Sequence, residues 1–199
     1  MAAFAGGHMQ TITNYFAENF GGKRATLRHL RNLAAYVAGR FSRHERLDAT
    51  RIERLVFVCK GNICRSAYAH AVASARGLRA ASFGLDTPGD EPADPVAARN
   101  ALARGVSLAT HRTSSSRSFA LEPTDLLVVM EPEQAQELEL LEGRHQVTLL
   151  GLWSKPRRPF IQDPYGRSDE YFQTCFGLID SGVHGLERLL KSATTISTR

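Results

Sequence analysis

Short apolar runs alternate with amphipathic segments over the last three quarters of the chain. Four runs have the length and composition of buried strands, and they lie at residues 55–58, 80–83, 126–130 and 147–150. Segments with helical periodicity follow them, at residues 66–76, 95–103, 132–141 and 169–191. Strands that alternate with helices predict right-handed β-α-β units around a parallel sheet. We therefore predict an α/β fold, with a four-stranded parallel sheet and helices on both of its faces.

The first quarter of the chain has a different pattern, which is typical of an amphipathic basic helix. Between residues 24 and 47, apolar side chains fall on one face and arginines surround the other. The apolar face consists of Leu27, Leu30, Leu33, Ala34, Val37 and Phe41. Such a face most often packs on the domain, but membrane contact, dimerisation and docking across the protein's own cleft are open alternatives. The pair Gly21-Gly22 is expected to end a shorter helix within residues 11–20.

Two regions follow from these patterns. Residues 1–50 are expected to form an N-terminal helical extension, of which MAAFAGGHM at residues 1–9 looks like a tag remnant. Residues 51–195 are expected to form the α/β domain. The 199 residues are 43% hydrophobic, which is enough for one main globular unit with its own core.

The excess positive charge is concentrated in the extension. Residues 1–54 hold nine Lys/Arg and four Asp/Glu, whereas residues 55–199 hold sixteen of each, so the whole net charge of +5 lies in the first quarter. Because no nucleic-acid reading motif accompanies this charge, we expect no nucleic-acid partner. No apolar run approaches about 18 residues and no secretory signal pattern occurs, which predicts a cytoplasmic protein. The basic helix is then the candidate for peripheral membrane contact.

The candidate chemistry lies in the turn VCKGNICRSA at residues 58–67, which follows the first apolar run. A turn between a strand and a helix directs backbone N–H groups and the helix dipole towards one point, which makes it an anion cradle. Gly61 and Asn62 suit the unusual backbone angles of such a turn. The N–H groups and Arg65 favour a thiolate at Cys59, so that this sulfur can act as a nucleophile. The planar fork of Arg65 matches two oxygens of a phosphoryl group.

Two other uses of this turn are disfavoured by its sequence. Cys59 and Cys64 are separated by four residues, and no second Cys/His pair has the spacing of zinc ligands. A nucleotide P-loop would need a Gly-Lys-Ser/Thr ending, which the turn lacks. We therefore expect neither a metal nor a cofactor. The odd count of three cysteines, without the dense spacing of a secreted domain, indicates reduced thiols.

These residues resemble the low-molecular-weight protein tyrosine phosphatases, whose signature is Cys, five residues, Arg, Ser. The loop residues that agree are Val58, Cys59, Gly61, Asn62, Ile63, Cys64, Arg65 and Ser66. Further agreement includes Ser82, the run DLLVVMEPE and the segment DPYG at residues 163–166, and the resemblance covers about residues 53–192. Bacterial members tied to capsule or exopolysaccharide tyrosine kinases look most similar. The resemblance implies that the domain has a phosphatase I-like fold and that the protein acts as a protein tyrosine phosphatase.

The resemblance also implies the roles of individual residues. Cys59 would be the nucleophile, Arg65 the phosphate-binding arginine and Asp163 the general acid, which a thiolate attack on a phosphate ester of tyrosine requires. Ser66 would hydrogen-bond the cysteine sulfur, and Ser82 would support the loop together with Asn62. The expected substrate-binding residues are Lys60, Gly61, Asn62, Ile63, Cys64, Ser66 and Tyr165, the last as an aromatic wall for the phosphotyrosine ring.

The chain departs from the family pattern at three places. Ala67 stands where the family usually has proline, the segment LDTPGDEPAD lacks the usual second apolar wall of the cleft, and His111-Arg112 is followed by TSSSR. Cys64 is close enough to Cys59 along the loop to form a disulfide under oxidant, which we state as a hypothesis. Cys175 is expected to be an inert core thiol.

Several functions compete with tyrosine phosphatase. An arsenate reductase would need further downstream cysteines besides Cys175, and arginine phosphatases of this family carry threonine at the position of Ile63. A catalytically silent phosphoprotein-binding module would lack the nucleophile or the acid, which are both present. The expected partner is a phosphotyrosine protein, with a membrane tyrosine kinase as the candidate, and the chain can be a monomer or a dimer.

Overall fold

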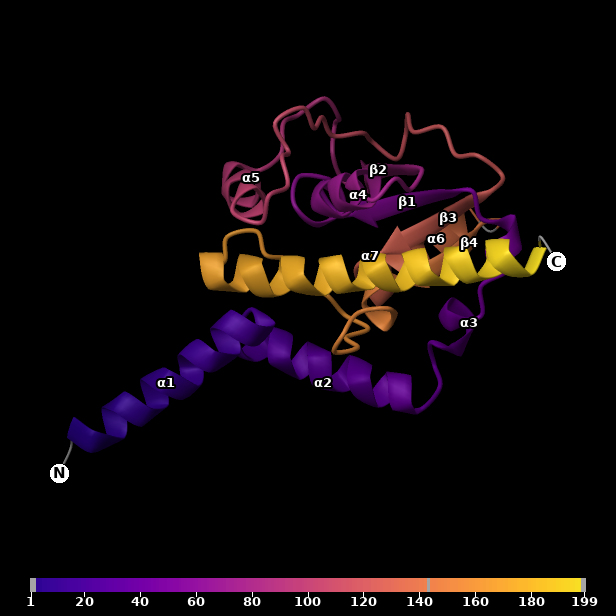
Figure 1. Cartoon of the computed structure of the whole chain (residues 1–199). Helices are drawn as coiled ribbons and strands as arrows, with labels where there is room; N and C mark the ends of the chain where they lie inside the picture. The colour runs from indigo at the N-terminus through magenta and orange to yellow at the C-terminus, as the bar shows by residue number, and fades with distance from the viewer. Residues whose placement is uncertain (1–2, 143, 198–199) are drawn as a thin grey trace.

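The four predicted strands form one parallel sheet in the computed structural model, which describes residues 3–142 and 144–197 (Figure 1). Side chains are described for residues 11–140 and 144–193. The strands are β1 Arg54–Cys59, β2 Ala80–Gly84, β3 Asp125–Val129 and β4 Gln146–Leu149. Their order across the sheet is β2-β1-β3-β4. The predicted α/β fold is therefore confirmed, and β1 lies inside the sheet with a paired strand on each side.

Helices cover both faces of the sheet. Since alternate side chains of each strand point to opposite sides, each strand contributes to the core on both faces. Phe57 and Val128 point into a core completed by α4, α5 and α7, whereas Val56 and Val129 point into a second core completed by α6. The helices are α4 Arg65–Ala75, α5 Pro95–Leu102, α6 Pro132–Glu142 and α7 Asp169–Ser197. Figure 1 shows α7 crossing one face of the sheet and α6 lying behind it. Short 3-10 helices lie at Ala49–Arg51 and Leu150–Leu152.

The extension is helical, but its second helix is shorter than its sequence pattern predicts. Helix α1 spans Ala3–Phe20 and α2 spans Lys23–Val37, and Gly21 and Gly22 between them have φ values of 78° and 110°. The predicted continuous helix from 24 to 47 is wrong. It stops because Gly39 adopts a φ of 74° and the Arg40 N–H donates back to the Ala35 carbonyl, 3.0 Å away. A separate short helix, α3, covers Ser42–Glu45.

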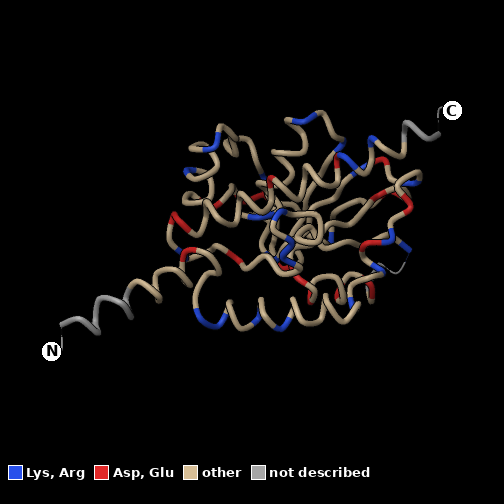
Figure 2. The backbone as a smooth tube through the Cα atoms, turned by 60° about the horizontal axis from the view of Figure 1, so that its bottom comes forward, with Lys and Arg blue, Asp and Glu red and all other residues tan. Residues whose placement is uncertain are grey.

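Helix α2 packs on the domain through a face that contains Ala25 and His29, while most of its predicted apolar face is exposed and Leu33 is half-buried. The exposed fractions of Leu27, Leu30 and Val37 are 70%, 55% and 80%, whereas Ala25 and His29 are buried. The common arrangement, in which the leucine face is buried, therefore does not occur. Figure 2 shows lysines and arginines along α2, whose sequence contains no acidic residue. Among the described residues, no helix is long and apolar enough to cross a membrane.

Candidate active site

The loop between β1 and α4 places Cys59 at the carboxyl end of an inner strand. Its sulfur accepts the Asn62 N–H at 3.3 Å and lies 3.0 Å from Ser66 Oγ. Ser66 Oγ also accepts from Asn62 Nδ2 at 2.8 Å, so the serine proton is free to point at the sulfur. Because α4 begins at Arg65, the loop and the helix N-terminus face the same point. Asn62 and Ser66 are thus both in contact with the Cys59 sulfur.

Asn62 holds the loop in shape through its backbone and its side chain. Its φ is 56°, a left-handed conformation that asparagine tolerates better than most residues. The side chain is fully buried, and Nδ2 donates to Ser82 Oγ at 3.0 Å as well as to Ser66. Its Oδ1 accepts the Ser114 N–H at 2.9 Å. All the hydrogen-bonding groups of this amide therefore connect the loop to the segments around it.

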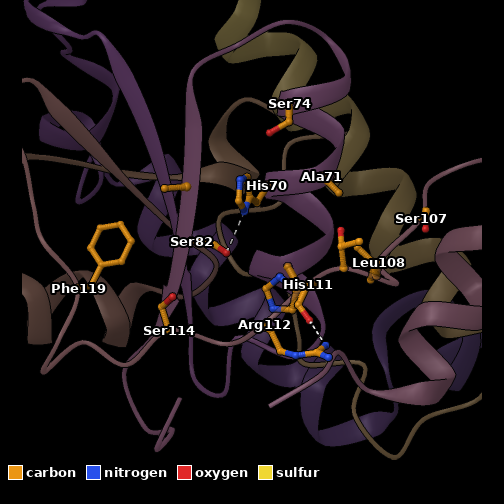
Figure 3. A pocket seen from close by; sticks show the side chains of 13 residues that line it. His70, Ala71, Ser74, Ser82, Ser107, Leu108, His111, Arg112, Ser114 and Phe119 are labelled. Atoms are coloured by element: carbon orange, nitrogen blue, oxygen red, sulfur yellow. Dashed lines mark hydrogen bonds between the residues drawn. The ribbon is translucent and has the colours of Figure 1, made fainter. Parts of the chain in front are cut away.

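Histidines lie directly behind the loop, around a cavity of about 440 Å³ (Figure 3). His111 Nε2 donates to the Asn62 carbonyl at 2.7 Å, and His70 Nδ1 lies 3.4 Å from Ser82 Oγ. Burial lowers the pKa of both imidazoles, and His111 lowers that of His70 further. Both rings are therefore expected to be neutral near pH 7. The sequence predicted no role for His111, and the structure shows it supporting the loop backbone.

The guanidinium group of Arg65 is nearly completely buried, with 1% of its side chain exposed. Nη1 donates to Glu131 Oε1 at 2.5 Å and to the Ile161 carbonyl at 2.9 Å, and Nη2 donates to Asp163 Oδ2 at 2.7 Å. Burial opposes its charge, but Asp163 and Glu131 raise the pKa of Arg65 above its ordinary value. Its Nε is buried and has no partner among the described residues. A charged donor is thus left available for an oxyanion.

Glu131 is a site residue that the sequence pattern did not identify. It lies two residues beyond the end of β3, and its backbone N–H donates to Gln134 Oε1 at 3.2 Å, which fixes the start of α6. Its side chain is 14% exposed and bonds to Arg65. The sequence feature that could have identified Glu131 is its position just after a predicted strand. Side chains at the carboxyl ends of parallel strands gather at one edge of a sheet, where ligands bind.

The mouth of the site is a small hollow of about 190 Å³ beside the cysteine. It is lined by Cys59, Lys60, Gly61, Ile63, Cys64, Asp86, Asp163 and Tyr165. The ring of Tyr165 is 62% exposed, and its backbone N–H donates to Asp163 Oδ1 at 3.2 Å. From the segment LDTPGDEPAD, Asp86 lines the hollow, and its carboxylate lies 3.6 Å from Lys60 Nζ. This segment therefore contributes a charged residue to the hollow and no second apolar wall.

The two other cysteines are buried and reduced. Burial raises the pKa of the Cys64 and Cys175 thiols well above the ordinary value, so both are expected to be protonated at neutral pH. Cys175 belongs to the core cluster that also contains Phe172 and Phe176. Within the described part of the chain, no group of three or more His, Cys, Asp or Glu side chains could hold a metal ion.

Comparison with known proteins gives a consistent result for residues 54–195, which match the family model "Low molecular weight phosphotyrosine protein phosphatase". The relative Etp of Escherichia coli K12 is 31% identical over 130 residues, which cover 63% of this chain and 86% of that protein. Wzb of Salmonella typhi is 32% identical over 131 residues, with coverages of 64% and 87%. Both are low molecular weight protein-tyrosine-phosphatases by name.

Solved structures of such phosphatases share the fold. The crystal structure of the tyrosine phosphatase AmsI of Erwinia amylovora matches with a TM-score of 0.62 and 27% identity, covering 70% of this chain and 93% of that one. Wzb of Escherichia coli K30, solved with sulphate, matches with a TM-score of 0.58 and 27% identity, with coverages of 71% and 98%. The arginine phosphatase YwlE of Geobacillus stearothermophilus has a TM-score of 0.63 at 20% identity, which shows likeness of fold alone.

Proposed function

Because this chain belongs to the low molecular weight phosphotyrosine protein phosphatase family, we propose that it hydrolyses phosphotyrosine in proteins through a phosphocysteine intermediate. The observation that carries the proposal is the combination of a loop-held sulfur, Cys59, with Arg65, whose buried Nε has no partner in the described part of the chain. A phosphoryl dianion bound by that donor and by the loop N–H groups would sit beside the sulfur. The anion would supply the partner that Nε of Arg65 lacks among the described residues.

In the first step, the Cys59 sulfur attacks phosphorus and the bond to the tyrosine oxygen breaks. The leaving phenolate takes a proton from the carboxylic acid of Asp163. This carboxyl group is held at the mouth by Arg65 Nη2 at 2.7 Å and by the Tyr165 N–H at 3.2 Å. A general acid in this position contributes about 10²–10⁴ to the rate.

In the second step, a water molecule attacks the phosphocysteine and the S–P bond breaks. Asp163, now ionised, accepts the proton of the water, and inorganic phosphate leaves. The departing sulfur carries negative charge, which the hydroxyl of Ser66 stabilises from 3.0 Å and the Asn62 N–H from 3.3 Å.

The substrate ring would lie against Tyr165, which stands exposed at the rim. Aromatic rings stack favourably on such a surface, and Tyr165 lines the hollow beside Cys59. Lys60 and Asp86 form an ion pair in the lining of the same hollow. We therefore expect specificity to depend on polar residues that flank the phosphotyrosine.

The proposed partner is a membrane tyrosine kinase of an exopolysaccharide or capsule system, on the strength of the family resemblance. The exposed face of α2 suits contact with an anionic membrane, since Leu27, Leu30 and Val37 point outward and Lys23 and Arg24 flank them. Co-sedimentation with anionic vesicles at low and high salt tests this surface. Binding at low salt that is lost in Leu30→Asp supports it, and no binding at low salt refutes it.

The catalytic proposal is tested by hydrolysis of p-nitrophenyl phosphate and of matched peptides that carry phosphotyrosine, phosphoserine or phosphoarginine. We expect turnover with phosphotyrosine and its complete loss in Cys59→Ser. Activity that survives this substitution would refute the cysteine mechanism. An inactive wild type that still binds the phosphopeptide would favour the silent binding module. Preference for the phosphoarginine peptide would identify the protein as an arginine phosphatase instead.

A further inference from the structure

A helix outside the family-matched region contacts the carboxylate that holds the arginine of the loop. The family match begins at residue 54, whereas α2 spans Lys23–Val37. Arg28 Nη2 of this helix lies 3.3 Å from Oε2 of Glu131, whose Oε1 accepts from Arg65 Nη1 at 2.5 Å. One carboxylate therefore bridges a guanidinium of the extension and a guanidinium of the active site. We propose that Arg28 is a positioning residue, which sets the affinity of the loop for the phosphoryl group through Glu131.

Arg28 also contacts the second support of Arg65. Its guanidinium carbon lies 4.3 Å from the ring centroid of Phe160, and this phenylalanine is 2% exposed. The next residue is Ile161, whose carbonyl accepts from Arg65 Nη1 at 2.9 Å. The two acceptors of Nη1 thus lie on segments that Arg28 touches. Displacement of α2 would leave both segments without this contact.

The charges around Arg65 explain why the contact affects binding. Arg65 is paired with two carboxylates, those of Glu131 and Asp163, and both repel an incoming dianion. Arg28 shares the negative charge of Glu131 and adds a positive charge next to it. Screening by solvent is weak around Glu131 and Arg65, which are 14% and 1% exposed, and stronger at Arg28, which is 37% exposed and also lies 3.2 Å from Glu133 Oε1. Without Arg28, the site is one unit more negative and Glu131 competes more strongly with the phosphoryl group for Arg65.

Helix α2 offers a matched control for this experiment. Arg31 lies about one helical turn beyond Arg28, and its Nη2 is 3.7 Å from Oε1 of Glu133. Its side chain is 69% exposed. Arg31→Gln therefore removes the same charge from the same helix but leaves the contact between Arg28 and Glu131 in place, although Glu133 also lies 3.2 Å from Arg28 Nη2.

The test uses the full chain and measures KM and kcat for p-nitrophenyl phosphate, the inhibition constant of inorganic phosphate, and thermal stability. Arg28→Gln is expected to raise KM and the inhibition constant about three- to tenfold, with a smaller change in kcat. Arg28→Lys is expected to restore most of the affinity, and Arg31→Gln to change it less than about twofold. In a Glu131→Gln background, Arg28→Gln should have a clearly smaller effect, because only its contact with Phe160 then remains on the path to Arg65.

Two results would overturn the inference: unchanged phosphate inhibition in Arg28→Gln, or an equal loss in Arg31→Gln. The inference rests on the proposed function, but the two can fail separately. A wild type without phosphatase activity refutes the proposed function, and calorimetric binding of inorganic phosphate to wild type and Arg28→Gln still tests the role of Arg28. Active wild type with identical kinetics in Arg28→Gln refutes only the positioning role.

Discussion

Asn62 is the residue whose side chain should contribute most to holding the active-site loop. Asn62→Ala removes three hydrogen bonds, each worth about 1 kcal/mol, and leaves the Ser114 N–H without its partner. It also places alanine at a φ of 56°, which costs about 1 kcal/mol more. We therefore expect a loss of about 3–5 kcal/mol in the free energy of unfolding.

Asn62→Gly is the matched control, because glycine accepts the left-handed backbone but makes none of the side-chain bonds. It should be about 1 kcal/mol more stable than Asn62→Ala and still clearly less stable than wild type. Urea unfolding followed by circular dichroism measures both free energies, and p-nitrophenyl phosphate turnover reports the geometry around Cys59. Wild-type stability in Asn62→Gly would show that the side-chain hydrogen bonds of Asn62 do not stabilise the loop.

Three further predictions concern the acid, the loop thiol and the pH dependence of stability. Asp163→Asn should lower kcat by about 10²–10⁴ for phosphotyrosine peptides and less for p-nitrophenyl phosphate, whose leaving group needs less protonation; equal losses on both substrates would contradict this. Cys64→Ser should make inactivation by peroxide harder to reverse with thiol than in wild type, and equal recovery would exclude protection by a disulfide with Cys59. Hydrogen bonds from Lys191 and Arg76 hold the pKa of Glu187 at about 2, below its ordinary value of 4.5. Its folded-state pKa is depressed, so its contribution to stability is present above pH 4.5 and is lost as pH falls from 4.5 towards 2. Unfolding free energies at pH 7 and pH 3 should therefore differ less in Glu187→Gln than in wild type, and an unchanged difference would contradict the assignment.

The sheet and the loop could be predicted because both are encoded locally. Buried parallel strands appear as apolar runs, and a loop that binds an anion needs glycine, asparagine and a helix start within a few residues. The structure accordingly contains β1 and α4 where the pattern indicated them, with ends shifted by about one residue.

The remaining features depend on contacts between distant segments. The link from Glu131 to Arg65 joins residues 66 positions apart, and nothing in the run DLLVVMEPE says which side chain it will meet. Helix α2 presents its leucines to solvent because Arg28 on the other face finds the carboxylates of Glu131 and Glu133. Periodicity identifies an apolar face, but it does not say whether the domain has a surface to receive it.

Cys59 is expected to carry the phosphoryl group during turnover. This is tested most directly by quenching the wild-type enzyme with acid during turnover of a phosphotyrosine peptide and locating the phosphoryl group by peptide mass spectrometry. We expect one phosphoryl group on the peptide that contains Cys59, with more of it in Asp163→Asn if the second step becomes slower than the first, and none in Cys59→Ser. Continued turnover with no phosphoryl group on Cys59, or with the group on another residue, would contradict it.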